Sequence, residues 1–262
     1  MADGDSDREP PWRRAAADRP PAGSQAVADV LADQLLRLGG PARQRLAEAL
    51  HQLGAIDRAV YQAIASVPAP ALDRAMRRLS NAANHSRLWL GIAAGIALTG
   101  PAGRRAAASG VLAIGVTSAV VNLGVKSVSA RQRPDRAGAG VPSVRHVTMP
   151  SSTSFPSGHS ASAFAFATAI SRDSPWLAIV IQLAAGAVAY SRVHTGVHYP
   201  GDTVAGALIG AGAGQAVSSI LDRAIGVARP HRPAVPPGGR AARPAASQRP
   251  ARRPPSTDPS CR

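Results

Sequence analysis

The sequence has very little cysteine and few aromatic side chains. Cys261 is the one cysteine among 262 residues, so no disulfide can close within the chain. Phe, Trp and Tyr together make up 3% of the residues, too few for the stacking surfaces with which proteins bind single-stranded nucleic acids. Arginine-rich segments attract phosphates, but this attraction carries no base specificity. We therefore expect no specific nucleic-acid partner.

Acidic residues and lysine are also scarce. Five acidic residues follow residue 87, which leaves little material for a two-metal site lined by carboxylates. The chain nevertheless carries a formal net charge of +15, almost entirely from arginine, and its single lysine is Lys126. This skew is typical of GC-rich coding. It leaves two interpretations of Lys126: an accident, or a position that requires a compact ammonium group.

Long apolar runs are concentrated in the middle of the chain. Residues 106–125 contain no charged residue over 20 positions and residues 203–221 none over 19, close to the roughly 20 residues that cross a bilayer. Three shorter runs occupy residues 88–103, 157–171 and 175–190. All are rich in Ala and Gly, as close helix packing in lipid favours, and a soluble domain rarely contains five such helices. The sequence therefore predicts an all-α integral membrane helical bundle of five to six spans.

The N-terminal region contains amphipathic patterns instead of long apolar runs. Residues 1–23 are polar and rich in proline, without the apolar segment of a signal peptide, which predicts a disordered tail. Apolar residues recur at helical spacing through residues 24–38, and Pro41 opens a second helix after two glycines. A third short helix places Leu72 and Leu79 opposite arginines. These helices either lie on a membrane surface or pack against the rest of the protein.

The patterns divide the chain into four parts. A disordered N-terminal tail (1–23) precedes an amphipathic helical segment (24–54) and a membrane-embedded domain (55–221). The last part (222–262) is a basic tail rich in Pro and Arg, and its composition predicts disorder. The expected fold is thus a membrane bundle with amphipathic N-terminal helices and disordered ends.

The breaks between the apolar runs differ in charge. Residues 104–105 and 172–173 are expected to form tight turns on one side of the membrane, and the C-terminal tail lies on that same basic side. The positive-inside rule makes this side cytoplasmic. The longer loops 126–156 and 191–202 would then face outward from the plasma membrane. Residues 1–87 would also lie outside, unless they contain a sixth or re-entrant segment.

Three cations stand at the outward ends of the apolar runs. Lys126, Arg133 and Arg192 have few acidic residues near them in the sequence, so together they suit a phosphate or another tetrahedral oxyanion. For each cation taken alone, the alternative is that its long side chain only reaches to the membrane interface.

A second cluster opens the third apolar run. Pro156 suits the first turn of a helix, so Ser157, Gly158 and His159 are expected at the positive end of that helix. Free backbone N–H groups, the Ser157 hydroxyl and the close approach that Gly158 allows would form an anion cradle there. The alternative is an ordinary helix start.

The third cluster contains a histidine and an aspartate four residues apart. Asp202 comes immediately before the last apolar run, where an Asp often serves as an N-cap. An Asp within reach of an imidazole also fixes its tautomer and stabilises the imidazolium. His198 could then attack phosphorus, with His159 as proton donor for the leaving oxygen. The clusters together supply what metal-free cleavage of a phosphate ester needs.

The three clusters read Lys-x6-Arg-Pro, Pro-Ser-Gly-His and Ser-Arg-x5-His-x3-Asp. In order and spacing this pattern resembles the three-part signature of the type 2 phosphatidic acid phosphatase superfamily, over about residues 55–221. The resemblance implies that His198 is the nucleophile of a phosphohistidine intermediate, Asp202 its orienting partner, and His159 the general acid and then base. It implies no metal and no cofactor, with the phosphoryl oxygens held by Lys126, Arg133, Ser157, Gly158 and Arg192.

The leading hypothesis is a membrane phosphatase acting on a lipid phosphate monoester or diphosphate, such as phosphatidic acid or a polyprenyl diphosphate. The sequence does not choose among these lipids and assigns no oligomeric state; the expected partners are the lipid substrate and membrane lipids. Vanadium-dependent haloperoxidases are similar in the same motifs, although their soluble architecture fits the longest apolar runs poorly. A further alternative is a non-catalytic anion-binding membrane protein. His194, His146 and His85 lie outside the signature and are expected to be exposed or locally bonded.

Overall fold

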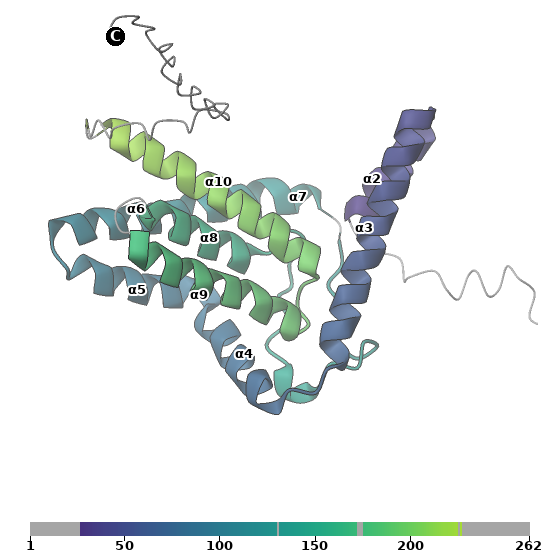
Figure 1. The fold of residues 1–262 in the computed structure, drawn as a ribbon, viewed down its shortest axis with the longest axis horizontal. Coiled ribbons are helices and arrows are strands. Elements are labelled where there is room, and N and C mark those ends of the chain that lie inside the picture. The colour runs from purple at the N-terminus through teal and green to yellow at the C-terminus, as the bar shows by residue number, and fades with distance from the viewer. Residues whose placement is uncertain (1–26, 130, 172–174, 225, 227–262) are drawn as a thin grey trace, which may run out of the picture. The chain divides into compact units, whose positions relative to one another are not determined.

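The computed structural model describes residues 27–129, 131–171, 175–224 and 226, and these residues form helices and loops without a strand. The predicted disordered tail 1–23 and most of the basic tail 222–262 lie outside them. The described residues contain nine α-helices and three short helical elements, and Figure 1 shows their arrangement. The α-helices are α2 (Val27–Leu38), α3 (Pro41–Ser66), α4 (Pro70–Ala82), α5 (Arg87–Ala97), α6 (Pro101–Ala119), α7 (Lys126–Val128), α8 (Gly158–Ile170), α9 (Pro175–His194) and α10 (Pro200–Ala224). The short elements are η1 (Asn84–Ser86), the π-helix η2 (Val120–Val125) and η3 (Ser143–Arg145).

All five apolar runs are helical, but they differ in length. Three helices are long and apolar enough to cross a bilayer: Pro101–Val125, Trp176–His194 and Pro200–Ala224. α5 has 11 residues and α8 has 13; at 1.5 Å per residue α8 is about 20 Å long, shorter than the roughly 30 Å of a hydrocarbon core. The 26-residue α3 is not among the three. An all-α membrane bundle is confirmed, and the count of five to six spans stays a prediction.

The central helix of this bundle is α8. It contacts α6, α9 and α10, and nine of its 13 residues are buried. On α10, Gly206, Gly210 and Gly214 face α8 at intervals of four residues, and a Cβ at any of them would overlap a carbonyl oxygen of α8 or of its N-cap. Small residues at this spacing let two helix backbones approach closely. The glycines thereby fix the start of α10 against the start of α8.

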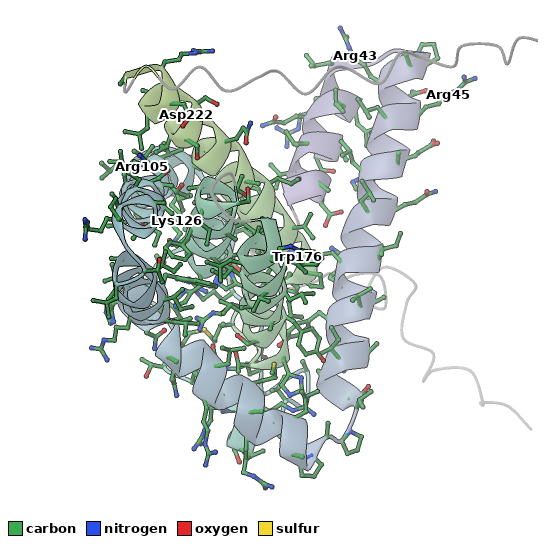
Figure 2. All side chains as sticks on the ribbon, turned by 60° about the vertical axis from the view of Figure 1, so that its left-hand side comes forward. Arg43, Arg45, Arg105, Lys126, Trp176 and Asp222 are labelled. Carbon is green, nitrogen blue, oxygen red and sulfur yellow. The ribbon has the colours of Figure 1, made fainter. Side chains whose placement is uncertain are left out.

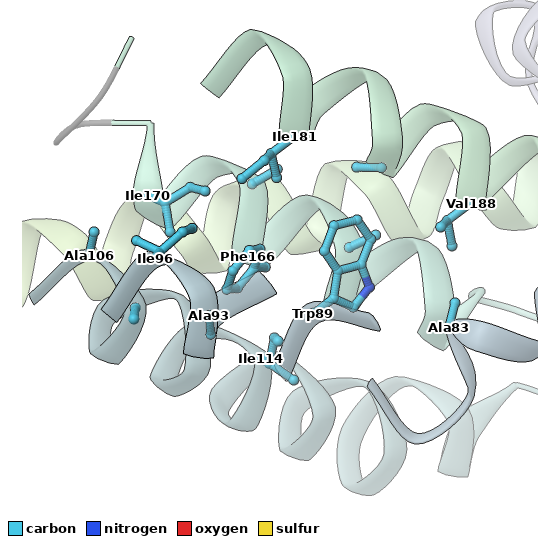
Figure 3. Close-up of a cluster of buried hydrophobic side chains, with 14 residues drawn as sticks. Ala83, Trp89, Ala93, Ile96, Ala106, Ile114, Phe166, Ile170, Ile181 and Val188 are labelled. Atoms are coloured by element: carbon cyan, nitrogen blue, oxygen red, sulfur yellow. The ribbon is translucent and has the colours of Figure 1, made fainter. Parts of the chain in front are cut away.

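A buried aromatic pair holds α5 against the other side of α8. Trp89 of α5 is 1% exposed, and its ring lies 5.6 Å from the Phe166 ring between centroids (Figure 3). Gly110 of α6 lies directly beneath Phe166, because a Cβ there would overlap the ring. This contact positions the chain that enters α5, residues 84–86, over the beginning of α8.

The N-terminal helices form a hairpin and a separate short helix. Gly39 and Gly40 have positive φ and break the chain between α2 and α3, and α3 then continues through residue 54, where the sequence analysis placed a domain boundary. Arg43 and Arg45 extend from the end of this hairpin (Figure 2).

One expectation about helix ends is wrong, and the apolar face of α4 is smaller than expected. On α4, Leu79 packs against the core, but Leu72 is 38% exposed. Asp73 and Ser80 are buried, because polar partners on neighbouring elements bind this face. Arg104 and Arg105 do not form a turn: Gly100 takes a positive φ and Pro101 starts α6, so both arginines lie inside that helix.

The contact between α8 and α10 can be tested with a pair of glycines. We expect Gly210→Leu to lower the midpoint of thermal unfolding in detergent, because overpacking costs about 1–3 kcal/mol and the facing atoms are backbone. Gly212→Leu is the matched control, since no atom lies within 4 Å of a Cβ built there. Equal midpoints for the two variants would contradict this packing.

Candidate active site

Several helix ends meet at one end of the bundle, and the predicted site residues lie there. η2 ends beside Lys126, α9 ends shortly after Arg192, and α8 and α10 both begin at this end (Figure 1). A backbone hydrogen bond of 2.9 Å from Ser157 N–H to the Asp202 carbonyl joins the starts of α8 and α10. Segments far apart in the sequence are therefore fixed around a common point.

His198 lies in the loop between α9 and α10 and is 1% exposed. Its Nε2 is 3.0 Å from Nη1 of Arg133. A guanidinium can only donate hydrogen bonds, so Nε2 must accept and the proton of the neutral ring must be on Nδ1. Nδ1 lies 3.5 Å from Oδ2 of Asp202, long for a hydrogen bond but close enough for the carboxylate to favour this tautomer. Nε2 is therefore unprotonated, and its lone pair can attack an electrophile once the hydrogen bond from Arg133 is released.

Asp202 is completely buried and strongly held. Its carboxylate accepts hydrogen bonds from Arg131 at 2.6 Å, from the Ser154 hydroxyl at 2.5 Å and from the Tyr199 N–H at 2.9 Å. α10 begins at Pro200, which rules out the alternative that Asp202 is only an N-cap. Asp202 sits at the third helical position and reaches back to the N–H of the residue before the helix. One carboxylate thereby fixes the helix start and the loop that carries the histidine.

Arg131 is a site residue that the sequence reasoning missed. It is 6% exposed and its guanidinium bridges Asp202 to Asp57 of α3, at 2.6 Å each. The same guanidinium lies 4.2 Å from the centre of the Tyr199 ring, and Asp57 also accepts the Gly201 N–H at 2.6 Å. Its position two residues before Arg133, in a chain with few acidic residues, could have suggested Arg131 as a site residue. Nothing in the sequence identifies Asp57 as its partner.

Lys126 and Arg133 meet at Ser152 in the long loop. The Lys126 ammonium donates to the Ser152 hydroxyl at 3.2 Å, and Arg133 donates to the same hydroxyl at 3.2 Å and to the Ser152 carbonyl at 2.9 Å. Burial lowers the pKa of both cations, and the charge of Arg133 lowers the pKa of Lys126 further. Two cations held this close favour an anion between them.

Arg192 contributes the third positive charge from α9 and is 1% exposed. Its Nη1 donates to the Ser80 hydroxyl of α4 at 2.5 Å, and its Nε has no hydrogen-bond partner among the described residues. A buried guanidinium with an unused donor is costly unless an anion binds it. Burial lowers the pKa of His159, and the charges of Arg192, Lys126 and Arg133 lower it further.

The start of α8 differs in one respect from the expected cradle. Ser157 is the N-cap and Gly158 the first helical residue, so Pro156 precedes the helix instead of occupying its first turn. The Ser157 hydroxyl accepts from Ser160 N–H at 3.4 Å. A Cβ on Gly158 would lie 3.7 Å from the Lys126 ammonium, an ordinary contact distance, so the first residue of α8 lies beside this cation. An anion here would meet both the helix N-terminus and the ammonium.

A cavity of about 200 Å³ opens beside these groups. Lys126, Gly158 and His159 form one wall, and His159 Nε2 lies 2.9 Å from Oδ1 of Asn84. Hydroxyl and amide side chains form much of the remaining wall. They are Ser86, Thr117, Ser118, Asn122 and Ser162.

The histidines outside the signature have three different environments: His194 is paired with a distant helix, His146 is bonded locally and His85 is exposed. His194 is 2% exposed and contacts Asp73 of α4 at 2.8 Å, and Asp73 also accepts from Arg145 at 2.7 Å. His146 contacts the Val141 carbonyl at 3.0 Å. His85 differs, because it is exposed and lines the cavity.

Comparison with known proteins adds to this geometry. A family model described as PAP2 superfamily matches residues 106–226. The decaprenylphosphoryl-5-phosphoribose phosphatase of Mycolicibacterium smegmatis is 35% identical over 142 residues, which cover 52% of this chain and 72% of the relative. That of Mycobacterium tuberculosis H37Rv is 34% identical over 159 residues, covering 60% and 84%.

The chain belongs to the PAP2 superfamily. Solved structures support the fold. A transmembrane PAP2 phosphatidylglycerolphosphate phosphatase from Bacillus subtilis aligns with a TM-score of 0.50 and 24% identity, covering 75% of this chain and 94% of that one. LpxE from Aquifex aeolicus aligns with a TM-score of 0.53 and 24% identity, covering 63% and 95%.

Several partners of the PAP2 site come from outside the segment that the family model matches. Residues before 106 supply Asp57 to Arg131, Ser80 to Arg192 and Asn84 to His159. None of the three was singled out from the sequence, since an isolated Asp, Ser or Asn on a helix or turn carries no recognisable spacing. The PAP2 motifs therefore form the centre of the site, and the N-terminal helices form part of its second layer.

The protonation of His198 is testable by titration. Burial lowers the pKa of His198 to about 4 from the ordinary 6.5; Asp202 opposes this shift, and Arg133 and Arg192 add to it. A histidine is neutral above its pKa, so the nucleophile stays neutral down to about pH 4. Because the unfolded chain binds this proton at higher pH, acidification from 6.5 towards 4 also favours unfolding.

We expect ¹⁵N NMR of histidine-labelled protein in detergent to show one imidazole that titrates near pH 4 and disappears in His198→Gln. A His146→Gln variant should retain that signal. A His198 midpoint between 6 and 7, roughly the range of an exposed imidazole, would contradict the buried neutral state.

Proposed function

We propose that this PAP2 protein is a membrane phosphatase that hydrolyses a lipid phosphate monoester through a phosphohistidine intermediate. The observation that carries the proposal is the environment of His198. Arg133 donates a hydrogen bond to Nε2, which is therefore unprotonated, and Asp202 lies beside the protonated Nδ1. Three cations nearby, with the start of α8, suit a dianionic phosphate.

The first step transfers the phosphoryl group to the protein. Nε2 of His198 attacks phosphorus, the P–N bond forms, and the P–O bond to the alcohol breaks. Protonated His159, whose positive charge the bound phosphate dianion stabilises, gives a proton to the leaving alcohol oxygen. Lys126, Arg133 and Arg192 stabilise the charge on the equatorial oxygens. The residual positive charge on the His198 ring is balanced by Asp202.

The second step returns the enzyme to its starting state. His159, now neutral, accepts a proton from a water molecule as the water oxygen attacks phosphorus. The P–N bond breaks and inorganic phosphate leaves. Water is the nucleophile of this second step, so no second protein nucleophile is required.

The leaving alcohol lies on the side of His159, so the cavity beside that residue receives it. Its wall carries neutral hydroxyl and amide groups along with Lys126, which suits an alcohol that bears further hydroxyls. The mycobacterial relatives are named for a polyprenyl-linked phosphosugar. We therefore favour a lipid-linked sugar phosphate over a diphosphate, whose second phosphate would need more positive charge. The membrane helices and the phosphatase relatives favour hydrolysis over halide oxidation.

A substrate panel with two histidine variants tests this function. Detergent-purified protein should release phosphate from a lipid-linked sugar phosphate, and less from polyprenyl diphosphate and phosphatidic acid. His198→Gln should lose more than about 1,000-fold in kcat, as removal of a nucleophile does, while His146→Gln remains active. Activity should persist in EDTA. Ordinary turnover by His198→Gln, or no turnover of any lipid by the native protein, would contradict the proposal.

We also propose that the active site faces outward and the C-terminal tail faces the cytoplasm. Arg104 and Arg105 near the start of α6 and Arg223 near the end of α10 are exposed, and these are the ends of the two helices that lie away from the site. Basic residues beside spans favour the cytoplasmic side.

The single cysteine provides the test of orientation. A membrane-impermeant maleimide should label Cys261 in broken cells and leave it unlabelled in intact ones. In a Cys261→Ser background, Val144→Cys should be labelled in intact cells, because Val144 is 40% exposed in the long loop on the site side. The reverse labelling would place the active site in the cytoplasm.

A further inference from the structure

The short turn between α4 and α5 contacts a residue of the proposed chemistry. Asn84 in η1 places its Oδ1 2.9 Å from Nε2 of His159, and both side chains are partly buried. The turn lies outside the segment matched by the family model. Among the described residues, the Asn84 side chain forms no hydrogen bond with any other site residue, so its contact with His159 requires its own explanation.

The contact determines which nitrogen of His159 can exchange a proton. An amide oxygen accepts and never donates, so Nε2 of His159 carries a hydrogen in both the neutral and the charged ring. Proton gain and loss must then occur at Nδ1. A general acid needs its labile proton aimed at the leaving oxygen, and a neutral acceptor at Nε2 fixes the ring without cancelling its charge.

The backbone of this turn is unusual. His85 and Ser86 both have positive φ, at 53° and 58°, a region that is strained for non-glycine residues. Such strain persists where the surroundings hold it in place, and here the buried Trp89 is fixed against Phe166 of α8. Phe166 and His159 are seven residues apart, on one face of that helix. The same face thus anchors the turn and receives Asn84.

We propose that Asn84 is a positioning residue for His159, holding Nε2–H so that Nδ1 delivers the proton to the leaving alcohol. This inference rests on the proposed phosphatase function. Asn84 forms no bond to the substrate and takes no proton itself. In the first step the Nδ1 proton of His159 goes to the alcohol oxygen as the P–O bond breaks.

The test compares leaving groups that differ in their need for a proton. An alkyl phosphate requires protonation of the departing oxygen, whereas 4-nitrophenolate leaves without it. The measured quantity is kcat/KM, because it reports the steps up to departure of the alcohol and is independent of phosphohistidine hydrolysis. We expect Asn84→Leu to lower kcat/KM by about 10- to 100-fold for a long-chain alkyl phosphate and by less than about threefold for 4-nitrophenyl phosphate, as displacement of an acid predicts.

Three variants complete the comparison. Asn84→Asp keeps an acceptor oxygen at the same place and should retain alkyl phosphate hydrolysis within a few-fold. Asn81→Leu, an exposed position on α4, should match the native protein on both substrates. If Asn84→Leu does not fold, Asn84→Ser is a smaller replacement whose side chain is too short to reach Nε2 of His159. It is expected to show the same leaving-group dependence.

The outcomes separate this inference from the proposed function. An equal loss on both substrates, or no recovery in Asn84→Asp, would show a merely structural role for Asn84 and overturn the inference. His159→Ala should reproduce the pattern of Asn84→Leu on the two substrates. Native protein that hydrolyses neither phosphate ester nor any lipid phosphate would instead contradict the phosphatase function.

Discussion

The main physical constraint on this structure is that arginines are buried inside a membrane protein that has few acidic residues to pair with them. Buried cations require a partner, and the carboxylates near the site are already engaged. Asp202 and Asp57 share Arg131, and Asp73 holds Arg145 and His194. Arg192 is left with a serine hydroxyl. Under the proposed function, a bound phosphate group would supply the negative charge that Arg192 lacks.

The same constraint explains why the N-terminal helices belong to the functional unit. The face of α4 that turns inward carries Asp73 and Ser80, and both bind side chains of α9. α3 supplies Asp57 to Arg131, which in turn holds Asp202. These helices therefore contribute hydrogen-bond partners where a larger apolar face was expected. In a protein related to PAP2 enzymes over the later part of the chain, the earlier helices supply part of what orients the motif residues.

Small residues let the helices that carry the site residues pack closely against each other. The glycines of α10 bring its backbone against α8, and the Ser157 N–H binds the Asp202 carbonyl where the two helices start. Larger side chains would separate the anion-binding end of α8 from the loop that carries His198. The high alanine and glycine content of the apolar runs thus serves both membrane packing and the alignment of the reacting groups.

The sequence by itself determined the membrane helices and the motif residues, since charge-free runs and fixed spacings are local properties. It identified Lys126, Arg133, His159, Arg192 and His198 as one group. It left open whether Asp202 is the N-cap of the last helix, because whether that helix starts at Pro200 or after Asp202 depends on what the carboxylate binds. Only the tertiary structure supplied Arg131 with Asp57, Arg192 with Ser80 and His159 with Asn84. Those pairs join residues more than 70 positions apart, and folding alone brings them within hydrogen-bond distance.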